Sequence, residues 1–497
     1  MQFQGGLITN LSPIAQAGQF PGSATGLRNF EPSTDGGYRR IQGFSKVEAD
    51  QVGGSSGRIR GVTRFNGKTY VAKGNSLYYA TGSGWSSALT TSLGGTGKVR
   101  FARHHFGANP ELIVIDGVNK PFKVVDGAPP TVTSISTAVA EQTGATAVVE
   151  HKNHMFFAKG KTLSFSAPFA AEDYTPGAGA GTREFDYDIT NLASFREQLI
   201  VFTTNTIFLV AGSSVTDFNF QPITRDIGAI KEDTVQEVGG DLMFLGPDGL
   251  RLLSATKRNN DFGLGVVSKV IQSEMTNFIS VADGFASVVI RGKSQYRILG
   301  FSSVNNASGR GIIGTQFAMQ GGEGMAWAET RGINAFCASS DLDGGIEYVF
   351  FGNDDGYVYQ MEEGNDFDGA NIIASFKTPP FPITDPTTRK TFYKMRLFTD
   401  PEGSLEVTMS PEYDFAEAGV AQPQSITVAN TTTGTVAIYG SGEYGSASYG
   451  GANLKYVFDL DLVGSAFVGS YTFTSDNTDP PFSFDSMIIQ YGQYGRR

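Results

Sequence analysis

The chain has 497 residues, more than one hydrophobic core usually holds, so we expect two or three domains. Its 63 Gly, 38 Phe and 19 Tyr favour many short strands joined by tight turns, and therefore an all-β fold. The single Cys excludes an internal disulfide and a cysteine-based metal finger, and the net charge of -11 disfavours a protein that grips DNA through Lys and Arg.

Residues 1–60 are predicted to form an N-terminal arm ahead of the regular strands. The opening MQFQGGLITNLSPIAQ has no basic stretch and no long apolar run, so we expect no secretory signal. Nowhere does the chain reach the ~18 to 20 apolar residues of a membrane span, so we expect no membrane anchor. Residues 29–47, NFEPSTDGGYRRIQGFSKV, mix Gly, Pro, basic and aromatic residues without a period, which indicates a turn-rich lead-in.

A hairpin pattern then repeats at a nearly constant interval. Each copy has four apolar-rich residues, a polar turn and a second apolar strand, as in a β-hairpin. The copies begin at positions 69, 112, 155, 199 and 242, at intervals of 43, 43, 44 and 43 residues. They read TYVAKGNSLYYA, LIVIDGVNKPFKV, MFFAKGKTLSFS, LIVFTTNTIFLV and LMFLGPDGLRLL, and looser copies follow at YRILGFSS and YVFFGNDDGYVYQM.

This period predicts a β-propeller over residues 61–376, with six to eight blades. The alternative is a β-sandwich with evenly spaced hairpins, which four consecutive intervals within one residue disfavour. One helix is expected at 267–280, where apolar residues follow a spacing of three to four. Those residues are Val267, Val270, Ile271, Met275 and Phe278.

The groups that could carry chemistry have plainer structural interpretations. His151 and His154 flank a strand entry, where alternation would point them to opposite faces, so we expect no metal site. The carboxylates between Gly352 and Gly369 could bind calcium or, as a pair, cleave a glycan, but Asp-Gly steps favour turns. Cys337 lies in an apolar strand and is expected to be a buried, inert thiol. We predict no catalytic residue and no cofactor.

The amino-acid composition changes after the last hairpin. Residues 377–390 contain four Pro and are predicted to be a linker, and residues 391–497 are predicted to be a C-terminal β-sandwich. Within the latter, Tyr439, Tyr444 and Tyr449 lie in a Tyr-Gly-Ser-rich stretch, a composition typical of recognition loops, although a solvated loop is equally possible. The 391–497 region holds five Lys and Arg against twelve Asp and Glu.

The lead-in resembles the N-terminal region of the tail hub, or nozzle, proteins of short-tailed bacteriophages, also called tail tubular or packaged-DNA stabilisation proteins. Their pattern is an Asn about ten residues before a Gly-aromatic-x-Arg-x-x-Gly turn. Here it is matched by Asn29, Gly37, Tyr38, Arg40 and Gly43. The similarity extends with fair specificity to about Met275, through GRIRGVTRFNGKTYVAKGNSLYYA and FLGPDGLRLLSAT.

The resemblance implies a virion protein of the phage tail, made in the host cytoplasm. It implies a homohexameric ring that extends the DNA channel below the portal and the head-to-tail adaptor, retains the packaged genome and lets it pass on ejection. The implied partners are other copies of the chain, the adaptor, tail fibre, spike or needle proteins, and genomic DNA that passes through the channel without sequence-specific binding. The acidic composition agrees with a wall that DNA slides past.

Two other functions stay open at the level of sequence. One is a receptor- or glycan-binding propeller protein, which would use the Tyr-Gly-Ser loops. The other is a glycan-cleaving enzyme, which needs two carboxylates ~5 to 10 Å apart at the propeller mouth, with Asp354 and Asp366 as the candidates.

Overall fold

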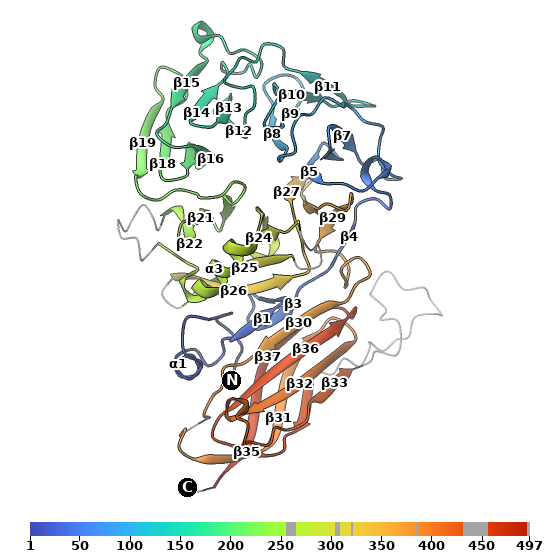
Figure 1. Cartoon of the computed structure of the whole chain (residues 1–497), viewed down its shortest axis with the longest axis vertical. Coiled ribbons are helices and arrows are strands. Elements are labelled where there is room, and N and C mark those ends of the chain that lie inside the picture. The colour runs from blue at the N-terminus through green and yellow to red at the C-terminus, as the bar shows by residue number, and fades with distance from the viewer. Residues whose placement is uncertain (255–264, 304–308, 320–321, 384, 431–455, 495–497) are drawn as a thin grey trace.

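The computed structural model describes residues 1–254, 265–303, 309–319, 322–383, 385–430 and 456–494. Nearly all regular structure in these residues is β-strand, as the composition predicts. Figure 1 shows a ring of small sheets at one end of an elongated molecule and a two-layered sandwich at the other. The blue N-terminal segment lies between them.

Seven blades form the propeller in the described residues: six are separate small antiparallel sheets, and the sixth blade in chain order is the β23–β26 part of a nine-stranded sheet that continues through β1 into the sandwich. The strands of the first three blades are β5 (Ile59–Phe65), β6 (Lys68–Lys73) and β7 (Ser76–Tyr79); β8 (Arg100–His104), β9 (Glu111–Ile115), β10 (Phe122–Val125) and β11 (Thr131–Ser134); and β12 (Ala147–His151), β13 (His154–Lys159), β14 (Thr162–Phe165) and β15 (Gly181–Glu184).

The remaining four blades follow in chain order. Their strands are β16 (Ile189–Phe195), β17 (Gln198–Thr203), β18 (Ile207–Ala211) and β19 (Asn219–Thr224); β20 (Gln236–Val238), β21 (Asp241–Gly246) and β22 (Gly249–Leu252); β23 (Gly284–Ile290), β24 (Gln295–Phe301), β25 (Arg310–Met319) and β26 (Gly322–Arg331); and β27 (Cys337–Asp343), β28 (Ile346–Gly352) and β29 (Val358–Met361), completed by β4 (Phe44–Lys46).

The repeated hairpins of the sequence are the second and third strands of successive blades, so the predicted propeller is confirmed, with seven blades within the expected six to eight. A separate apolar layer fills the space between neighbouring blades at six of the seven interfaces. Between blades three and four, for example, Phe156 and Leu163 pack with Leu199 and Val201. The layer between blades five and six is instead continuous with the core of the sandwich.

Two distant parts of the chain close the ring. The N-terminal strand β4 pairs with β29, with Phe44 opposite Met361 and Lys46 opposite Tyr359. The last blade thus takes its outer strand from the lead-in, and the propeller cannot complete itself without residues 44–46.

The second domain is a sandwich of two sheets, and the N-terminal segment contributes strands to both. One sheet runs β1 (Gly26–Arg28), β30 (Ile372–Lys377), β36 (Gly469–Asn477), β32 (Leu405–Tyr413) and β33 (Ile426–Asn430). The other runs β2 (Phe30–Pro32), β3 (Tyr38–Arg40), β37 (Phe482–Tyr494), β31 (Arg389–Pro401) and β34 (Val457–Asp461), with β35 (Ser465–Ala466) beside β31.

The domain boundaries in the structure differ from those expected. Residues 1–60 are not a separate arm, because β1, β2 and β3 are sandwich strands and β4 is a propeller strand. Residues 377–390 do not link the two domains, because they connect β30 to β31 inside the sandwich, and Thr378 is fully buried there. The sandwich therefore begins at β30 rather than at 391.

Strand β1 also fuses the two domains. It pairs in parallel with β26 of the sixth blade at Arg28 and antiparallel with β30 of the sandwich. Two short helices lie nearby: α1 (Pro13–Gln19), capped by Ser12, and α3 (Gln272–Val281), which buries Met275 and Phe278 as the sequence predicts. No helix in the described residues is long and apolar enough to cross a membrane.

The Gly43→Ala variant tests how tightly the lead-in fits. An added Cβ would overlap the main-chain carbonyl of Asp366, whereas at Gly107 it would meet open space. We expect Gly43→Ala to lower the free energy of unfolding by about 1–3 kcal/mol through overpacking, and Gly107→Ala to change it by less than about 0.5 kcal/mol. Urea denaturation measures both, and equal midpoints would contradict this packing.

Candidate functional site

The lead-in motif lies at the junction of the two domains. Asn29, 1% exposed and left-handed with φ 52°, donates its side-chain amide to the carbonyls of Arg331 in β26 (3.1 Å) and Ile373 in β30 (2.9 Å). Its side-chain oxygen accepts from the Arg331 amide (2.8 Å) and the Thr330 hydroxyl (3.0 Å). One amide side chain therefore holds a propeller strand against a sandwich strand.

Tyr38 and Gly37 anchor the first residues of the chain. The buried Tyr38 hydroxyl has the carbonyls of Gly22 (2.8 Å) and Gln4 (3.0 Å) within reach of its single proton, and it accepts from the Gly6 amide (3.1 Å). Gly37 has φ 80°, and an added Cβ would lie 2.5 Å from the Phe484 carbonyl oxygen. The motif requires Gly here because only Gly permits both the turn and this approach to β37.

Arg40 and Gly43 complete the junction. Arg40 is fully buried and donates to the carbonyls of Asn477 and Asp479 in the sandwich, each at 2.6 Å, and of Asn365 at 3.2 Å, after the last propeller strand. Burial lowers the pKa of its guanidinium to about 10. All five motif residues thus serve contacts within one chain, and Tyr38 and Arg40 have no surface to offer a neighbour.

A buried charge network runs through the same junction. Glu31 in β2, 2% exposed, pairs with Arg297 of β24 (2.8 Å), Lys293 (2.6 Å) and Arg39 of β3 (3.3 Å). Arg297 and Lys293 also bind the carboxylate of Glu362 beyond β29. Arg39 continues outward to Glu402 of the sandwich through a two-pronged contact of 2.7 and 3.0 Å.

The network lowers the pKa of the Glu362 carboxyl group. Burial alone would raise the pKa of Glu362, but the neighbouring Arg297 and Lys293 outweigh it and hold that pKa well below its usual range. Glu362 therefore stays ionised at neutral pH and acts as a member of a structural ion-pair network rather than as a proton donor.

A second charged cluster crosses the propeller axis. The first strand of each of the seven blades, or the residues just before it, lines a hollow of ≈ 330 Å³ on the propeller axis. Across it, Arg100 at β8 binds Asp233 ahead of β20 through contacts of 2.7 and 2.9 Å, and Lys98 binds the same carboxylate at 2.8 Å. Glu232 adds a contact to Arg100 at 2.6 Å.

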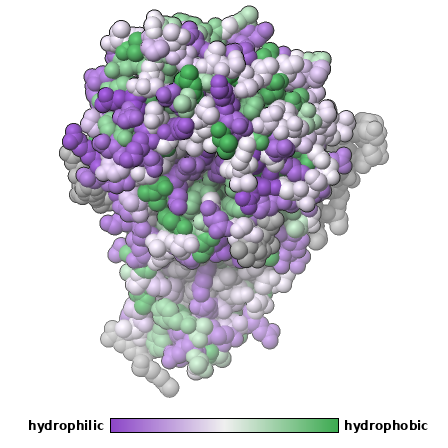
Figure 2. Space-filling model, turned by 45° about the horizontal axis from the view of Figure 1, so that its top comes forward, coloured by the Kyte–Doolittle hydropathy of each residue, from purple (hydrophilic) through white to green (hydrophobic). Residues whose placement is uncertain are grey.

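These ion pairs bridge the hollow on the propeller axis, and their role is structural rather than catalytic. Burial by itself would raise the pKa of Asp233, but Arg100 and Lys98 reverse this and keep it well below its ordinary value. Near the rim, the Asp341 carboxylate accepts from the Arg64 amide (2.9 Å) and the Thr63 hydroxyl (3.2 Å) and pairs with Arg103. These charged side chains of the axis thus satisfy one another across the blades. Figure 2 shows purple hydrophilic and green hydrophobic residues interspersed over the propeller end of the molecule.

The acidic segment after Gly352 is also engaged in local structure. Asp354 binds Arg58 through contacts of 2.6 and 3.1 Å. Asp355 accepts from the Tyr357 amide and the Tyr359 hydroxyl, both at 2.8 Å, and Asp366 accepts from the Gly369 amide at 2.6 Å. This agrees with the turn interpretation, and no cluster of three or more potential metal ligands occurs in the described ranges.

The expected geometry of the two histidines is wrong. His151 and His154 are register partners on either side of a two-residue turn, so their side chains share one face of the sheet instead of pointing to opposite faces. Each is used separately: His151 Nδ1 lies 2.8 Å from the Ser194 hydroxyl, and His154 Nδ1 donates to the Ser166 carbonyl at 2.6 Å. Burial lowers the pKa of His151 to about 4.

Cys337 is buried, with Sγ 3.4 Å from the Ile59 carbonyl, and burial raises its pKa to about 12, so the thiol has the inert character expected of it. The proposed contact residues Tyr439, Tyr444 and Tyr449 lie outside the described residues.

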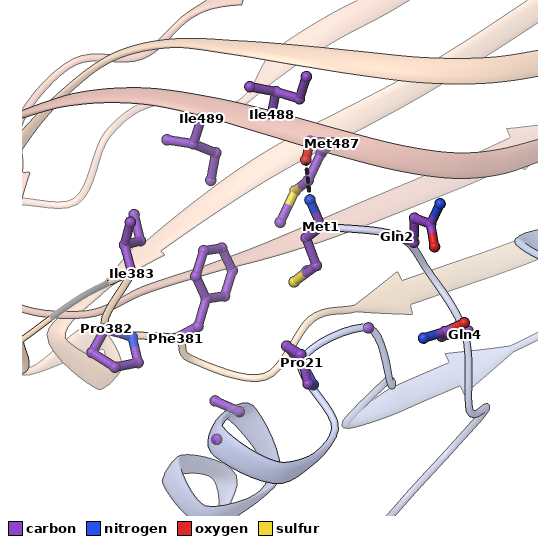
Figure 3. A pocket seen from close by; sticks show the side chains of 13 residues that line it. Met1, Gln2, Gln4, Pro21, Phe381, Pro382, Ile383, Met487, Ile488 and Ile489 are labelled. Carbon is purple, nitrogen blue, oxygen red and sulfur yellow. Dashed lines mark hydrogen bonds between the residues drawn. The ribbon is translucent and has the colours of Figure 1, made fainter. Parts of the chain in front are cut away.

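An apolar hollow of ≈ 560 Å³ lies on the sandwich side of the junction (Figure 3). Met1 and Pro21 of the N-terminal segment, Phe381 and Ile383 of the β30–β31 connection, and Met487 of β37 line it. The Met1 amino group donates to the Met487 carbonyl at 2.7 Å. Apart from the Met1 amino group, the described residues that line this hollow are uncharged.

Sequence reasoning identified the motif but missed the charges that the junction buries. A signal was present at Arg297, which interrupts the apolar run YRILGF in a strand whose every residue is buried. A cation in such a strand requires a partner. Its partners Glu31 and Glu362 lie far away in the chain, so the sequence alone does not identify them.

Comparison with known proteins adds little. No protein-family model and no curated protein matches the chain. Similar solved structures include the extracellular domain of a one-component system from B. thetaiotaomicron (10% identity, TM-score 0.40, 74% of this chain and 44% of that chain). Others are the Neurospora crassa Pan2 WD40 domain (7%, 0.37, 62% and 90%) and an exo-beta-1,3-galactanase from Phanerochaete chrysosporium (11%, 0.28, 90% and 100%).

The chain spans 44% of the length of the first of these structures. All three TM-scores lie below 0.5, so the propeller and the sandwich are assigned from the strand pairing of this chain and not from these likenesses.

The Glu362→Gln variant tests the junction network through its pH dependence. Because the folded-state pKa of Glu362 lies below its ordinary value of 4.5, its stabilising contribution is complete above that pH and is lost as the pH falls further. We expect the variant to be less stable at pH 7 by about 3 kcal/mol. We also expect its stability to fall less steeply than that of the parent below pH ~4.5.

Urea denaturation at a series of pH values measures both effects. Glu417→Gln, which changes an exposed carboxylate, is the control and should follow the parent. Identical acid slopes for the parent and Glu362→Gln would contradict the assigned role of the network.

Proposed function

We propose that this chain is a structural subunit of the tail nozzle of a short-tailed bacteriophage, in which a ring of copies extends the DNA channel. The observation that carries the proposal is the use of the lead-in motif. Asn29 and Arg40 bond to both the propeller side and the sandwich side of the junction, while Gly37, Tyr38 and Gly43 pack the lead-in against its surroundings within the chain. Internal rigidity of this kind suits a protein whose task is mechanical.

The DNA would pass through a channel enclosed by a ring of several copies of the chain. It would not pass through the hollow on the axis of a single propeller. A hollow of ≈ 330 Å³ has the size of a small-molecule site, and ion pairs cross it. A channel for a duplex therefore requires a ring of subunits, with the propeller as part of its wall. The homohexamer implied by the resemblance meets this requirement.

The charge of the chain also supports such a wall. The net charge is -11, and the region 391–497 contributes five cations against twelve carboxylates. Of the sandwich cations, Arg396 pairs with Asp459 at 2.8 Å and Lys377 with Glu412 at 2.8 Å, which reduces their attraction for phosphates. An acidic lumen would let DNA pass without adhering, since affinity for its backbone comes from unpaired Lys and Arg.

The proposed partners follow from this position in the particle. They are further copies of the chain, the head-to-tail adaptor above, tail fibre, spike or needle proteins below, and the genome in transit. The alternative is a receptor- or glycan-binding protein, which predicts binding by the isolated chain.

Restoration of DNA retention tests the proposal. Filled phage heads that carry portal and adaptor but lack this protein should leak DNA to a nuclease. Adding the purified chain should protect the DNA and produce a ring below the adaptor in electron micrographs. The Gly107→Ala variant, with its methyl group in open space, should protect equally well.

Continued leakage with no ring would overturn the nozzle proposal. Binding of the isolated chain to host cells or to a glycan array, in the same preparation that fails to close the heads, would favour the receptor-binding alternative.

A further inference from the structure

A polar hollow of ≈ 630 Å³ lies at the first blade, away from the axis and the domain junction. Three loops surround it: residues 55–57, the β6–β7 turn at 74–76, and residues 95–96. Their sequences are Ser-Ser-Gly, Gly-Asn-Ser and Gly-Thr, so small side chains, hydroxyls and main chain form much of the lining. The charged lining residues are Arg58, Arg60, Lys73 and Asp354.

Lys73 is a buried cation without a carboxylate. Its side chain reaches the Val52 carbonyl at 2.5 Å, the Ser55 hydroxyl at 3.1 Å and the Ser55 carbonyl. No ion pair among the described residues includes it, and burial lowers the pKa of its ammonium. Carbonyl oxygens satisfy its hydrogen bonds but do not neutralise its charge.

Arg60, 2% exposed, is bound in the same way. Its guanidinium donates to the carbonyls of Gly97 (2.6 Å), Gly74 (2.6 Å) and Gly94 (2.7 Å). This uses three of the five N–H donors of a guanidinium. The carboxylate that acts on it, Asp116, binds the Gly94 amide at 2.7 Å instead of the guanidinium itself.

The third cation is paired. Arg58 binds Asp354 at 2.6 and 3.1 Å and lies over the ring of Phe336 at 4.6 Å. Among the lining side chains, three cations therefore face one carboxylate. In a protein with a net charge of -11, this local excess of positive charge is an exception.

We propose that this hollow binds a small tetrahedral oxyanion, a phosphate or sulfate group. An anion there would compensate the charges of Arg60 and Lys73, neither of which forms an ion pair in the described residues. The unused N–H groups of Arg60 and the Ser and Thr hydroxyls of the loops are the donors that recognise such oxygens. Guanidinium groups suit phosphate in particular because their planar N–H groups match its geometry.

The phosphate could belong to a free ion or small metabolite, or to the backbone of a nucleic acid. A hollow of ≈ 630 Å³ has the size of a small-molecule site, which favours a small ligand over a duplex. Competition separates the two sources: a short DNA duplex should displace bound inorganic phosphate only if the site also accepts a backbone phosphate.

The test uses a pair of variants at Thr96, an exposed residue of the lining. Thr96→Glu places a carboxylate in the hollow, whereas Thr96→Gln adds nearly the same volume without charge. The melting temperature of each full-length protein is followed while inorganic phosphate replaces chloride at constant ionic strength. Phosphorus NMR line broadening measures the binding directly.

We expect saturable stabilisation and line broadening by phosphate for the parent and Thr96→Gln, and an affinity about tenfold or more weaker for Thr96→Glu. Ser56→Asp, on another loop of the hollow, should weaken binding in the same way. Phosphate also stabilises proteins in general as a salt, and this effect is the same for all variants. Comparing the variants with the parent therefore isolates the effect of binding at the hollow. Equal responses of Thr96→Glu and Thr96→Gln, or no response beyond chloride, would overturn the proposal.

Discussion

The burial of Glu31 among Arg297, Lys293 and Arg39 is the interaction on which the architecture depends. A carboxylate that is 2% exposed is costly unless its partners are all in place. Its partners come from the sixth blade and from the β3 strand, and Glu362 after the seventh blade shares two of them. Sliding one domain against the other would leave these charges buried and unpaired, so the network permits one arrangement.

The apolar core enforces the same arrangement. One continuous cluster runs from Leu245 in the fifth blade through Trp327 in the sixth to Phe376 and Met409 in the sandwich. Phe3 and Tyr38 of the N-terminal segment belong to this cluster and pack on Phe376, with ring centroids 4.9 Å apart in each case. The other blade interfaces have their own separate layers. The molecule is thus two domains by strand topology but one body by packing.

The parts of this fold that sequence predicted are the parts with local periodicity. Hairpins such as 155–166 contain their own turn and both strands, so their pattern is visible within twelve residues. The three-residue strands β1 to β4 have no period to detect, and three of them (β1, β3 and β4) pair with strands hundreds of residues away, such as β30, β37 and β29. The expectation that His151 and His154 point to opposite faces fails for a related reason. Side chains alternate only along one strand, and Lys152 and Asn153 between them have positive φ angles that reverse the chain.

The buried arginines show two ways of placing a cation inside this protein. Arg297 is matched by the carboxylates of Glu31 and Glu362, so its charge is compensated where it lies. Arg40 and Arg60 are surrounded by main-chain carbonyls, which the Gly-rich loops around Arg60 bring close. Arg40 crosses between two domains, and its bonds hold them together. Arg60 instead lines an open hollow beside Lys73 and Arg58. The same chemistry therefore holds two domains together at one site, and at the other it underlies the anion site proposed above.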